Sequence, residues 1–186
     1  IEQGRIVALF PGNPKNPRKG FDLAQGTVDL LQEKYGIDIE IKTLWGVSPD
    51  EVPWLMNASN FMFMTSFVEG SPNVVKEAMA CDLPVVAVHV GDVPELLEGV
   101  DGCHVCDRDP VHLAEAAREL LLCQGRNSGR SLGRRRICEL GLDMETVARR
   151  VLAIYEQALS QVAGSSKSSN TRVRVNTSGH TESVEV

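Results

Sequence analysis

The sequence predicts an α/β fold in which a parallel sheet is covered by helices on both faces. Three observations predict this class. Short apolar runs alternate along the chain with segments whose apolar residues recur at helical spacing. The run LPVVAV at 83–88 is apolar throughout, which is typical of a buried parallel strand. The connections between strands and helices are short, as they are in β–α–β units.

The elements follow one another in a regular order. Residues 5–10 (RIVALF) form a β-branched run, and 37–44 alternate with three Ile side chains on one face. Further strands are expected at 60–65, 83–88 and 102–106. Helices are expected at 21–35, from a capping box at 48–51, and at 72–81, 94–98, 110–123, 130–139 and 144–159. Because ligands bind at the carboxyl ends of parallel strands, the loops at 11–20, 44–48, 65–72 and 88–93 are the informative ones.

Composition limits the function classes. The 186 residues carry a net charge of −6, which argues against general nucleic-acid binding and predicts no nucleic-acid partner. Hydrophobic residues make up 42%, enough for a core, but no apolar run approaches the ~20 residues of a membrane span. The five cysteines are an odd number, which favours a reducing compartment and a cytoplasmic location.

The chain is expected to divide into a folded domain, 1–163, and a tail, 164–186. The tail is rich in Ser and Thr and has too few large apolar residues to offset its ordering entropy, so we expect it to be disordered. The first residue is Ile1 and not an initiator Met, so we expect a processed chain or a fragment.

The densest chemistry lies in TSFVEGSPNVVKEAMACD, residues 65–82. Ser71 is a natural N-cap, and Pro72 at the first helical position has no N–H. The first free amides of the helix then belong to Asn73 and Val74. Unpaired amides and the helix dipole favour an anion, typically a phosphate.

Two carboxylates, Glu69 and Glu77, flank this helix start. Each accepts hydrogen bonds only, so the pair is suited to hold hydroxyl groups on either side of a bound diphosphate. The alternative is that Glu77 is a solvated charge on an amphipathic helix and Glu69 a loop residue.

The segment EGSPNVVKEAMACDLPVVAVHVGDVPE closely resembles the Glu-x7-Glu region of the group 1 (family four) glycosyltransferases, which are retaining enzymes of GT-B fold. The similarity covers about residues 5–160 and is closest to bacterial polysaccharide and teichuronic-acid type members. The positions that match the family pattern are Glu69, Gly70, Pro72, Glu77, Ala78, Met79, Ala80, Pro84, Val85, Val86, Ala87, Gly91 and Glu95.

The resemblance implies roles for individual residues. Glu77 would hold the ribose hydroxyls of the donor nucleotide, and Glu69 would contact the transferred sugar near the reacting centre. Backbone amides in the segment 70–74 would face the sugar and the diphosphate. The residues concerned are Gly70, Ser71, Asn73 and Val74.

The first loop supplies cations in this family. Lys19, with Gly20, matches the family's Lys-Gly and would face the diphosphate. Asn13 stands nearest to the usual Arg, so the second cation is missing or comes from Arg18 or Lys15. The alternative is that these are solvated loop charges.

Trp45 lies in the loop that the family uses near the base. It is expected either to stack there or to pack with Trp54 against the following helix.

Two positions depart from the family. Asp82 and Asp92 replace glycines, and Asp92 is expected to be the N-cap of the next short helix.

Three further motifs are interpreted as structural. In D-R-D at 107–109, Asp109 is expected to cap a helix rather than to bind metal. Cys103 and Cys106 form a C-x-x-C that lacks the second pair a zinc site needs. The arginines between Arg126 and Arg136 are interpreted as a solvated helix face, the alternative being peripheral contact with anionic lipid on the inner membrane face.

The sequence therefore predicts a Rossmann-like, donor-binding domain, the C-terminal half of a GT-B enzyme, without its N-terminal acceptor domain. It would bind a UDP- or GDP-linked sugar for metal-independent, cofactor-free transfer of a hexose with retention, in polysaccharide or glycolipid synthesis. Alone, we expect it to bind nucleotide weakly and to transfer little. The alternatives are a nucleotide-sugar epimerase or phosphorylase of the same fold, or a non-catalytic sugar-nucleotide-binding module.

Overall fold

A computed structural model describes residues 6–123 and 129–167. The chain divides into two compact units between Leu142 and Asp143. In the first unit, every apolar run that was expected to be a strand joins one parallel sheet. The strands are β1 (Ile6–Phe10), β2 (Ile39–Thr43), β3 (Phe61–Met64), β4 (Val85–Val88) and β5 (His104–Cys106).

The sheet has the order β2-β1-β3-β4-β5, with Ile6 opposite Ile39 and Met62 opposite Val85. The strand order reverses between β1 and β3, which places a crevice for ligands at their carboxyl ends. All residues of β3 and β4 are buried, whereas β2 lies at the edge and is mostly half-buried. This explains why β2 alternates in sequence while β4 is apolar throughout.

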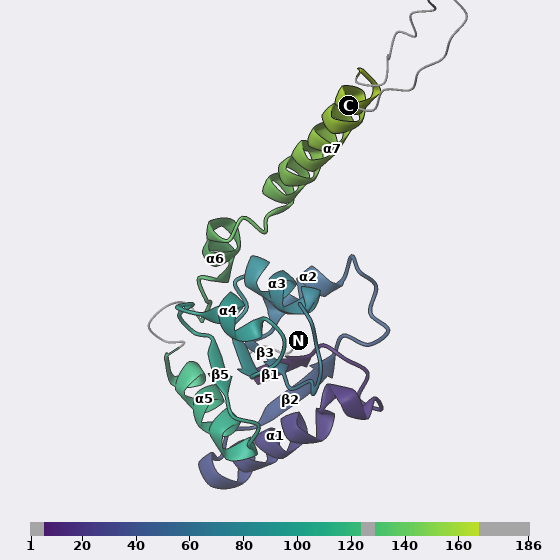
Figure 1. Cartoon of the computed structure of the whole chain (residues 1–186). Coiled ribbons are helices and arrows are strands. Elements are labelled where there is room, and N and C mark those ends of the chain that lie inside the picture. The colour runs from purple at the N-terminus through teal and green to yellow at the C-terminus, as the bar shows by residue number, and fades with distance from the viewer. Residues whose placement is uncertain (1–5, 124–128, 168–186) are drawn as a thin grey trace, which may run out of the picture. The chain divides into compact units, whose positions relative to one another are not determined.

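Helices cover both faces of the sheet (Figure 1). On one face lie α1 (Phe21–Tyr35) and α5 (Pro110–Cys123). On the other lie α2 (Val52–Ala58), α3 (Asn73–Ala80) and α4 (Val93–Leu97), and α6 (Gly133–Glu139) packs against α3 and α4. The predicted fold class is thereby confirmed. The core between the layers contains aromatic and aliphatic side chains such as Phe10, Phe61, Phe63, Leu31 and Leu113.

The start of α2 differs from the prediction. The helix begins at Val52, not at Ser48. Ser48 and Glu51 instead close a turn before the helix, in which the Glu51 amide donates to the Ser48 carbonyl at 2.9 Å. The Ser48 amide donates to Glu51 Oε2 at 3.3 Å, which is half of the expected reciprocal box. Half of the predicted capping box is therefore present, and it stabilises the turn and not the helix.

The second unit contains α7 (Met144–Lys167), which runs past its expected end at Leu159 and across the expected boundary at 163. Asp143 caps it by accepting from the Thr146 amide at 2.9 Å. The remainder of the predicted tail, 168–186, lies outside the described residues. In the described ranges, no helix is both long and apolar enough to cross a bilayer.

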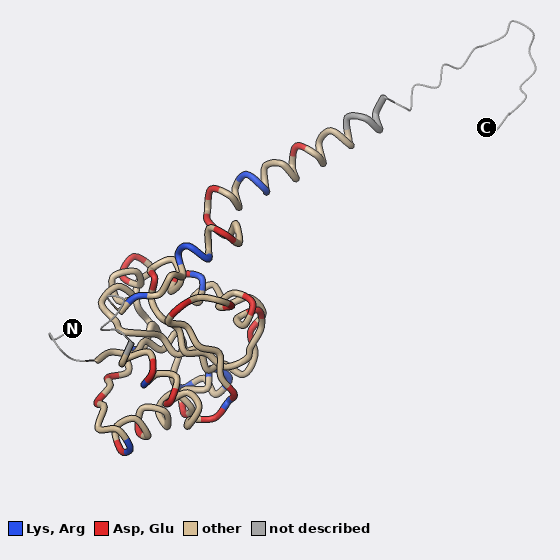
Figure 2. The backbone as a smooth tube through the Cα atoms, turned by 90° about the vertical axis from the view of Figure 1, so that its left-hand side faces the viewer, with Lys and Arg blue, Asp and Glu red and all other residues tan. Residues whose placement is uncertain are grey.

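The arginine cluster is not simply a solvated face, which corrects the interpretation above. Arg130, Arg134 and Arg136 donate to backbone carbonyls at the C-terminal ends of α2, α3 and α4, at 2.9 to 3.4 Å. The acceptors are Met56 and Ser59, then Ala80, then Glu95. Such cations satisfy carbonyls that a helix leaves unpaired. Figure 2 shows the consecutive basic positions of α6; Arg126 lies outside the described residues.

Asp82 has a structural reason for replacing a glycine. Its φ of 52° is the left-handed conformation that follows the end of α3, and aspartate tolerates this conformation better than most residues. Its Oδ1 accepts from the Arg134 amide at 2.8 Å, at the N-terminus of α6. The carboxylate therefore links two helices, which glycine could not do.

Close packing of α6 on α3 requires Gly133. A Cβ at this position would lie 2.6 Å from the Met79 Cα. We expect Gly133→Ala to lower the free energy of unfolding by about 2 kcal/mol in urea titrations. Gly26→Ala, inside α1 with its nearest neighbour 4.0 Å away, serves as control and should be neutral or stabilising by up to ~1 kcal/mol. Equal stabilities for the two variants would contradict the packing described.

Candidate functional site

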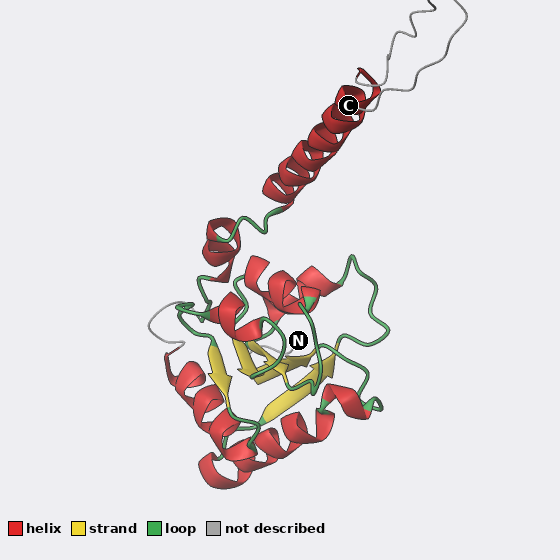
Figure 3. Ribbon diagram, viewed as in Figure 1, coloured by secondary structure: helices red, strands yellow, loops and turns green. Residues whose placement is uncertain are grey.

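The loops that follow β1, β2, β3 and β4 leave the sheet at its carboxyl edge (Figure 3). These loops and the helix α3 contain the residues that the sequence singled out, and the loop after β3 is bonded to the loops after β1 and β4. Because β1 and β3 are neighbours in the sheet, the loop at 11–20 meets the loop at 65–72 directly. The site is built on that meeting point.

The first loop and the turn after β3 interlock through backbone groups. The Phe67 amide donates to the Arg18 carbonyl at 2.8 Å, and Thr65 Oγ1 donates to the Gly20 carbonyl at 2.9 Å. Gly20 has a φ of 68°, and a Cβ there would overlap the Thr65 carbonyl oxygen. Only glycine permits this approach, which explains why a glycine follows Lys19.

This interlock brings the predicted Lys19 and Glu69 together. Lys19 Nζ lies 2.6 Å from Glu69 Oε1, and the Glu69 side chain is 17% exposed. Burial raises the pKa of the Glu69 carboxyl, but hydrogen bonds from Lys19 and Ser66 and the charges of Lys19 and Arg18 outweigh it, so the pKa is lowered. Glu69 is therefore a carboxylate at neutral pH. The two residues were predicted separately; their pairing was not.

The N-terminus of α3 offers free donors. Its N-cap is Pro72, with no side-chain cap, so the expectation that Ser71 is the N-cap was wrong. Val75 is the first residue whose amide bonds back, to the Pro72 carbonyl at 3.1 Å. Within the described residues, the amides of Asn73 and Val74 have no acceptor. The predicted pair of unpaired amides is present, and it favours an anion.

Ser71 has another role. Its hydroxyl donates to Asp92 Oδ2 and accepts from Lys76 Nζ at 2.7 Å. As predicted, Asp92 occupies the N-cap position of α4, and its carbonyl accepts from the Leu96 amide at 3.0 Å, although its side chain makes no cap bond. Its amide instead donates to the Gly70 carbonyl at 3.0 Å. Through the Ser71 hydroxyl, the positive charge of Lys76 lies near the negative charge that Asp92 introduces where the family has a glycine.

Glu77 is exposed and lines an open pocket of about 470 Å³. The other lining residues are Val47, Pro49, Val52, Pro53, Met56, Ala80 and Cys81, which come from the loop before α2, from α2 and from α3. An apolar hollow with one carboxylate suits a ring that stacks on aliphatic groups and carries hydroxyls beside it. Glu77 therefore faces a space that could hold a nucleoside.

The remaining predicted residues lie at the margin. Trp45 is 65% exposed and does not line this pocket, and Trp54 is 77% exposed, so the packing of the two against the helix is not observed. Asn13 Oδ1 accepts from the Lys15 amide at 3.0 Å, within its own loop. Arg18 is exposed.

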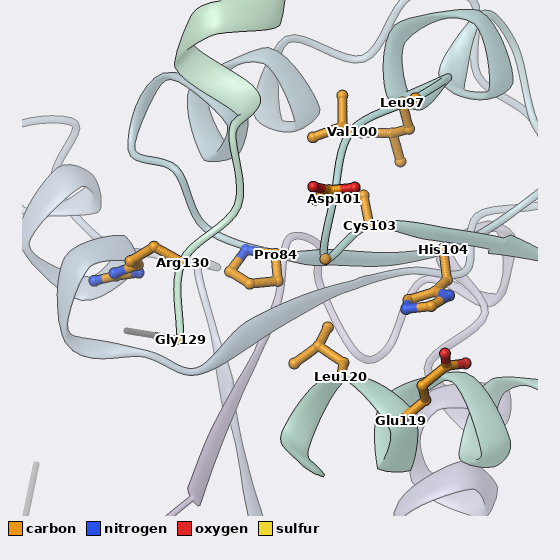
Figure 4. A pocket seen from close by; sticks show the side chains of 12 residues that line it. Pro84, Leu97, Val100, Asp101, Cys103, His104, Glu119, Leu120, Gly129 and Arg130 are labelled. Atoms are coloured by element: carbon orange, nitrogen blue, oxygen red, sulfur yellow. The ribbon is translucent and has the colours of Figure 1, made fainter. Parts of the chain in front are cut away.

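A second pocket, of about 440 Å³, lies at the opposite edge of the sheet (Figure 4). It is lined by Cys103, whose burial raises the pKa of the thiol to about 11, so this cysteine is not a thiolate at neutral pH. Cys106, the other member of the C-x-x-C, also has a raised pKa because of burial. In the described part of the chain, no three potential ligand side chains gather to hold a metal ion.

Sequence reasoning missed Arg108 and Lys76. Arg108 Nη1 donates to the Thr65 carbonyl at 2.8 Å, and its guanidinium stacks on the Phe67 ring at 4.0 Å. The partners of Arg108 lie more than 40 positions away in sequence, so no local pattern marks its contacts. Asp109, as predicted, caps α5 by accepting from the Val111 amide at 2.7 Å.

The fold agrees with the comparisons to known proteins. The chain belongs to the family described as glycosyl transferases group 1, whose model matches residues 20–122. It is 33% identical over 144 residues to MMP alpha-(1->4)-mannosyltransferase from Mycolicibacterium hassiacum, covering 74% of this chain and 34% of that protein. It is 32% identical over 93 residues to N-acetyl-alpha-D-glucosaminyl L-malate synthase from Bacillus anthracis, covering 50% and 24%. The chain thus spans about a third or less of these relatives.

Solved structures show the same fold. Sucrose-phosphate synthase from Thermosynechococcus elongatus aligns with a TM-score of 0.70 at 19% identity, over 87% of this chain and 47% of that one. Anabaena HepE in complex with UDP-glucose aligns with a TM-score of 0.54 at 19% identity, over 87% and 49%. These alignments confirm that the chain has the fold of one half of a GT-B protein.

The Lys19–Glu69 pair predicts a measurable change in ionisation. In Lys19→Met, the Glu69 pKa should rise, because the carboxylate loses its charged donor. Because the pKa of Glu69 is lower in the folded than in the unfolded chain, its ionisation stabilises the fold at pH values above the unfolded-state pKa. This stabilisation is lost as the pH falls through the folded-state pKa. The variant should therefore lose about 1 kcal/mol at neutral pH and little in acid.

Carboxyl NMR titration of Glu69 and urea unfolding at both pH values measure these effects. Lys42→Met, which removes a cation that lies 3.5 Å from Glu40 on β2, is the control and should leave the Glu69 pKa unchanged. An unchanged Glu69 pKa in Lys19→Met would contradict the pairing.

Proposed function

We propose that this chain is the donor-binding half of a glycosyltransferase that moves a sugar from a nucleoside diphosphate sugar to an acceptor hydroxyl. The observation that carries the proposal is the unpaired amides of Asn73 and Val74 at the start of α3, in the same segment as Glu69, which pairs with Lys19, and Glu77, which lines the pocket. Family membership and a structural neighbour that binds UDP-glucose support it.

The donor would bind in three parts along this edge. The diphosphate would accept from the two α3 amides and face Lys19. The nucleoside would lie in the pocket of about 470 Å³, with its ribose hydroxyls on Glu77. The sugar would extend towards Glu69, Gly70 and Ser71, where Glu69 and the Ser71 hydroxyl offer acceptors for its hydroxyls.

Catalysis would rest on charge stabilisation of the departing diphosphate. As the glycosidic bond to phosphate breaks, negative charge grows on the leaving oxygen, and preorganised N–H groups and an ammonium lower its energy. In the reaction we propose, no metal and no enzyme nucleophile takes part. The acceptor hydroxyl attacks the sugar carbon from the side of the leaving group, with retention, and its proton passes to the phosphate oxygen of the departing diphosphate.

The acceptor site belongs in a second domain. The relatives are about three or more times longer than the matched segment, so the reacting cleft is proposed to form against a further domain of a longer protein. Three departures from the family, Asn13, Asp82 and Asp92, weakly favoured a degenerate binding module. Asp82 and Asp92 have structural partners, Arg134 and Ser71, so these two positions no longer support that alternative.

The alternative on the same fold is a nucleotide-sugar epimerase or phosphorylase. The Glu-x7-Glu context disfavours an epimerase, and one experiment separates an epimerase from a transferase. The full-length parent protein would be incubated with a donor sugar but no acceptor, and the sugar followed by NMR. An epimerase converts the donor under these conditions, whereas a transferase needs the acceptor. Calorimetry of this chain with UDP, GDP and ADP would identify the base.

The helix amides are testable one at a time. Asn73 is the first residue of α3, where proline is well accommodated, and Pro72 already has the extended backbone that a following proline requires. Asn73→Pro should therefore remove one N–H without breaking the helix. We expect a ~10-fold weaker UDP affinity by calorimetry, about 1.4 kcal/mol.

Asn73→Ala, which keeps the amide, is the matched control and should bind within ~2-fold of the parent. Uridine, which has no phosphate, should bind both variants equally. Identical UDP affinities for the Pro and Ala variants would contradict an amide contact to the diphosphate.

Glu77→Ala tests the nucleoside pocket. Loss of its carboxylate should weaken UDP and uridine by the same factor, on the order of 10-fold, because the ribose is common to both. Glu95→Ala, an exposed glutamate on α4 outside this pocket, is the control. A Glu77→Ala protein that binds both ligands like the parent would show that this residue is a solvated charge.

A further inference from the structure

Arg108 lies in the short loop between β5 and α5, and the loop holds its backbone in place. The Asp109 amide donates to the Asp107 carbonyl at 2.8 Å. The Asp109 carboxylate caps α5 through the Val111 amide at 2.7 Å. Arg108 is thus presented from a capped helix start, next to the carboxyl end of β3.

The guanidinium contacts three consecutive residues of the turn after β3. Nη1 donates to the Thr65 carbonyl at 2.8 Å, Nη2 donates to the Ser66 carbonyl, and the plane of the group stacks on the Phe67 ring at 4.0 Å. Thr65 and Ser66 are buried, so their carbonyls need a protein donor. Arg108 supplies both donors from one rigid fork.

The same turn anchors the first loop. Thr65 donates to the carbonyls of Lys19 and Gly20 at 3.2 and 2.9 Å, and the Phe67 amide donates to the Arg18 carbonyl at 2.8 Å. Two residues after the turn comes Glu69, 2.6 Å from Lys19. Arg108 is therefore bonded to the turn that holds Lys19 and Glu69, and it forms no hydrogen bond or ion pair with either side chain in the described part of the chain.

We propose that Arg108 is a positioning residue for the donor site: by fixing the turn at 65–67, it sets where Lys19 and Glu69 stand. This rests on the proposed function above, because it assigns Lys19 to the diphosphate. A lysine could not replace the arginine, since a single ammonium has no planar pair of N–H groups and no flat surface for Phe67. Arg108, the middle residue of D-R-D at 107–109, thus acts on the donor site through the carbonyls of Thr65 and Ser66.

The test is a double-mutant cycle on the whole chain, with UDP as the probe in calorimetry. Arg108→Lys should weaken UDP binding 5- to 10-fold in the parent chain. In the Lys19→Met background the same change should cost less than 2-fold, because the residue through which Arg108 acts is gone. Arg118→Lys, whose guanidinium stacks on Tyr35 at 4.9 Å, should stay within 2-fold in both backgrounds.

An equal loss in both backgrounds would overturn the proposal, because Arg108 would then act on the ligand itself or on the whole fold. No loss in the parent chain would overturn it too. Should Arg108→Lys fold poorly, Phe67→Leu removes only the stacking and should weaken UDP binding in the same way, by a smaller factor that again disappears in Lys19→Met.

A second readout does not depend on the ligand. Displacement of Lys19 should raise the Glu69 pKa in Arg108→Lys, measured by carboxyl NMR, and not in Arg118→Lys. A chain that binds no UDP but shows this shift would refute the proposed function and keep the positioning role. A chain that binds UDP but shows neither the shift nor the affinity loss would refute the positioning role alone.

Discussion

The close contact between Gly20 and Thr65 is the constraint on which the site depends. Strands β1 and β3 are neighbours, so the loops that follow them must share one small region of space. Because residue 20 has no Cβ, the first loop can lie against the Thr65 carbonyl and bond to the turn at 65–67. Lys19 and Glu69, fifty positions apart in sequence, meet as a consequence.

A second close backbone contact, between Gly91 and Gly70, joins the loops after β3 and β4. Gly91 has a φ of 54°, and a Cβ there would overlap the Gly70 carbonyl oxygen, which accepts from the Asp92 amide. The loops after β3 and β4 therefore also touch through their backbones. Backbone contacts thus join the loops after β1, β3 and β4, and they hold the segment that leads into α3, so the free amides of α3 are preorganised before any ligand arrives.

Local patterns in the sequence predicted the strands, most helices, the unpaired amides and the acidic residues around them. They misplaced the side chains of Ser71 and Asp92, because each was assigned to a nearby helix cap whereas the two bond to each other across loops. The hydrogen bonds of Arg108 and of the carbonyl-binding arginines of α6 were not predicted for the same reason, because their acceptors are distant in sequence. Family resemblance supplied roles for Glu69 and Glu77 that residue spacing alone left open.

The central claim is that the α3 amides hold a diphosphate, and amide chemical shifts report on it most directly. Titration of the isotope-labelled chain with UDP should shift the Asn73 and Val74 amide resonances, whereas uridine should leave them in place and perturb the pocket near Glu77. Unchanged Asn73 and Val74 resonances at saturating UDP, or equal shifts with uridine, would contradict the account.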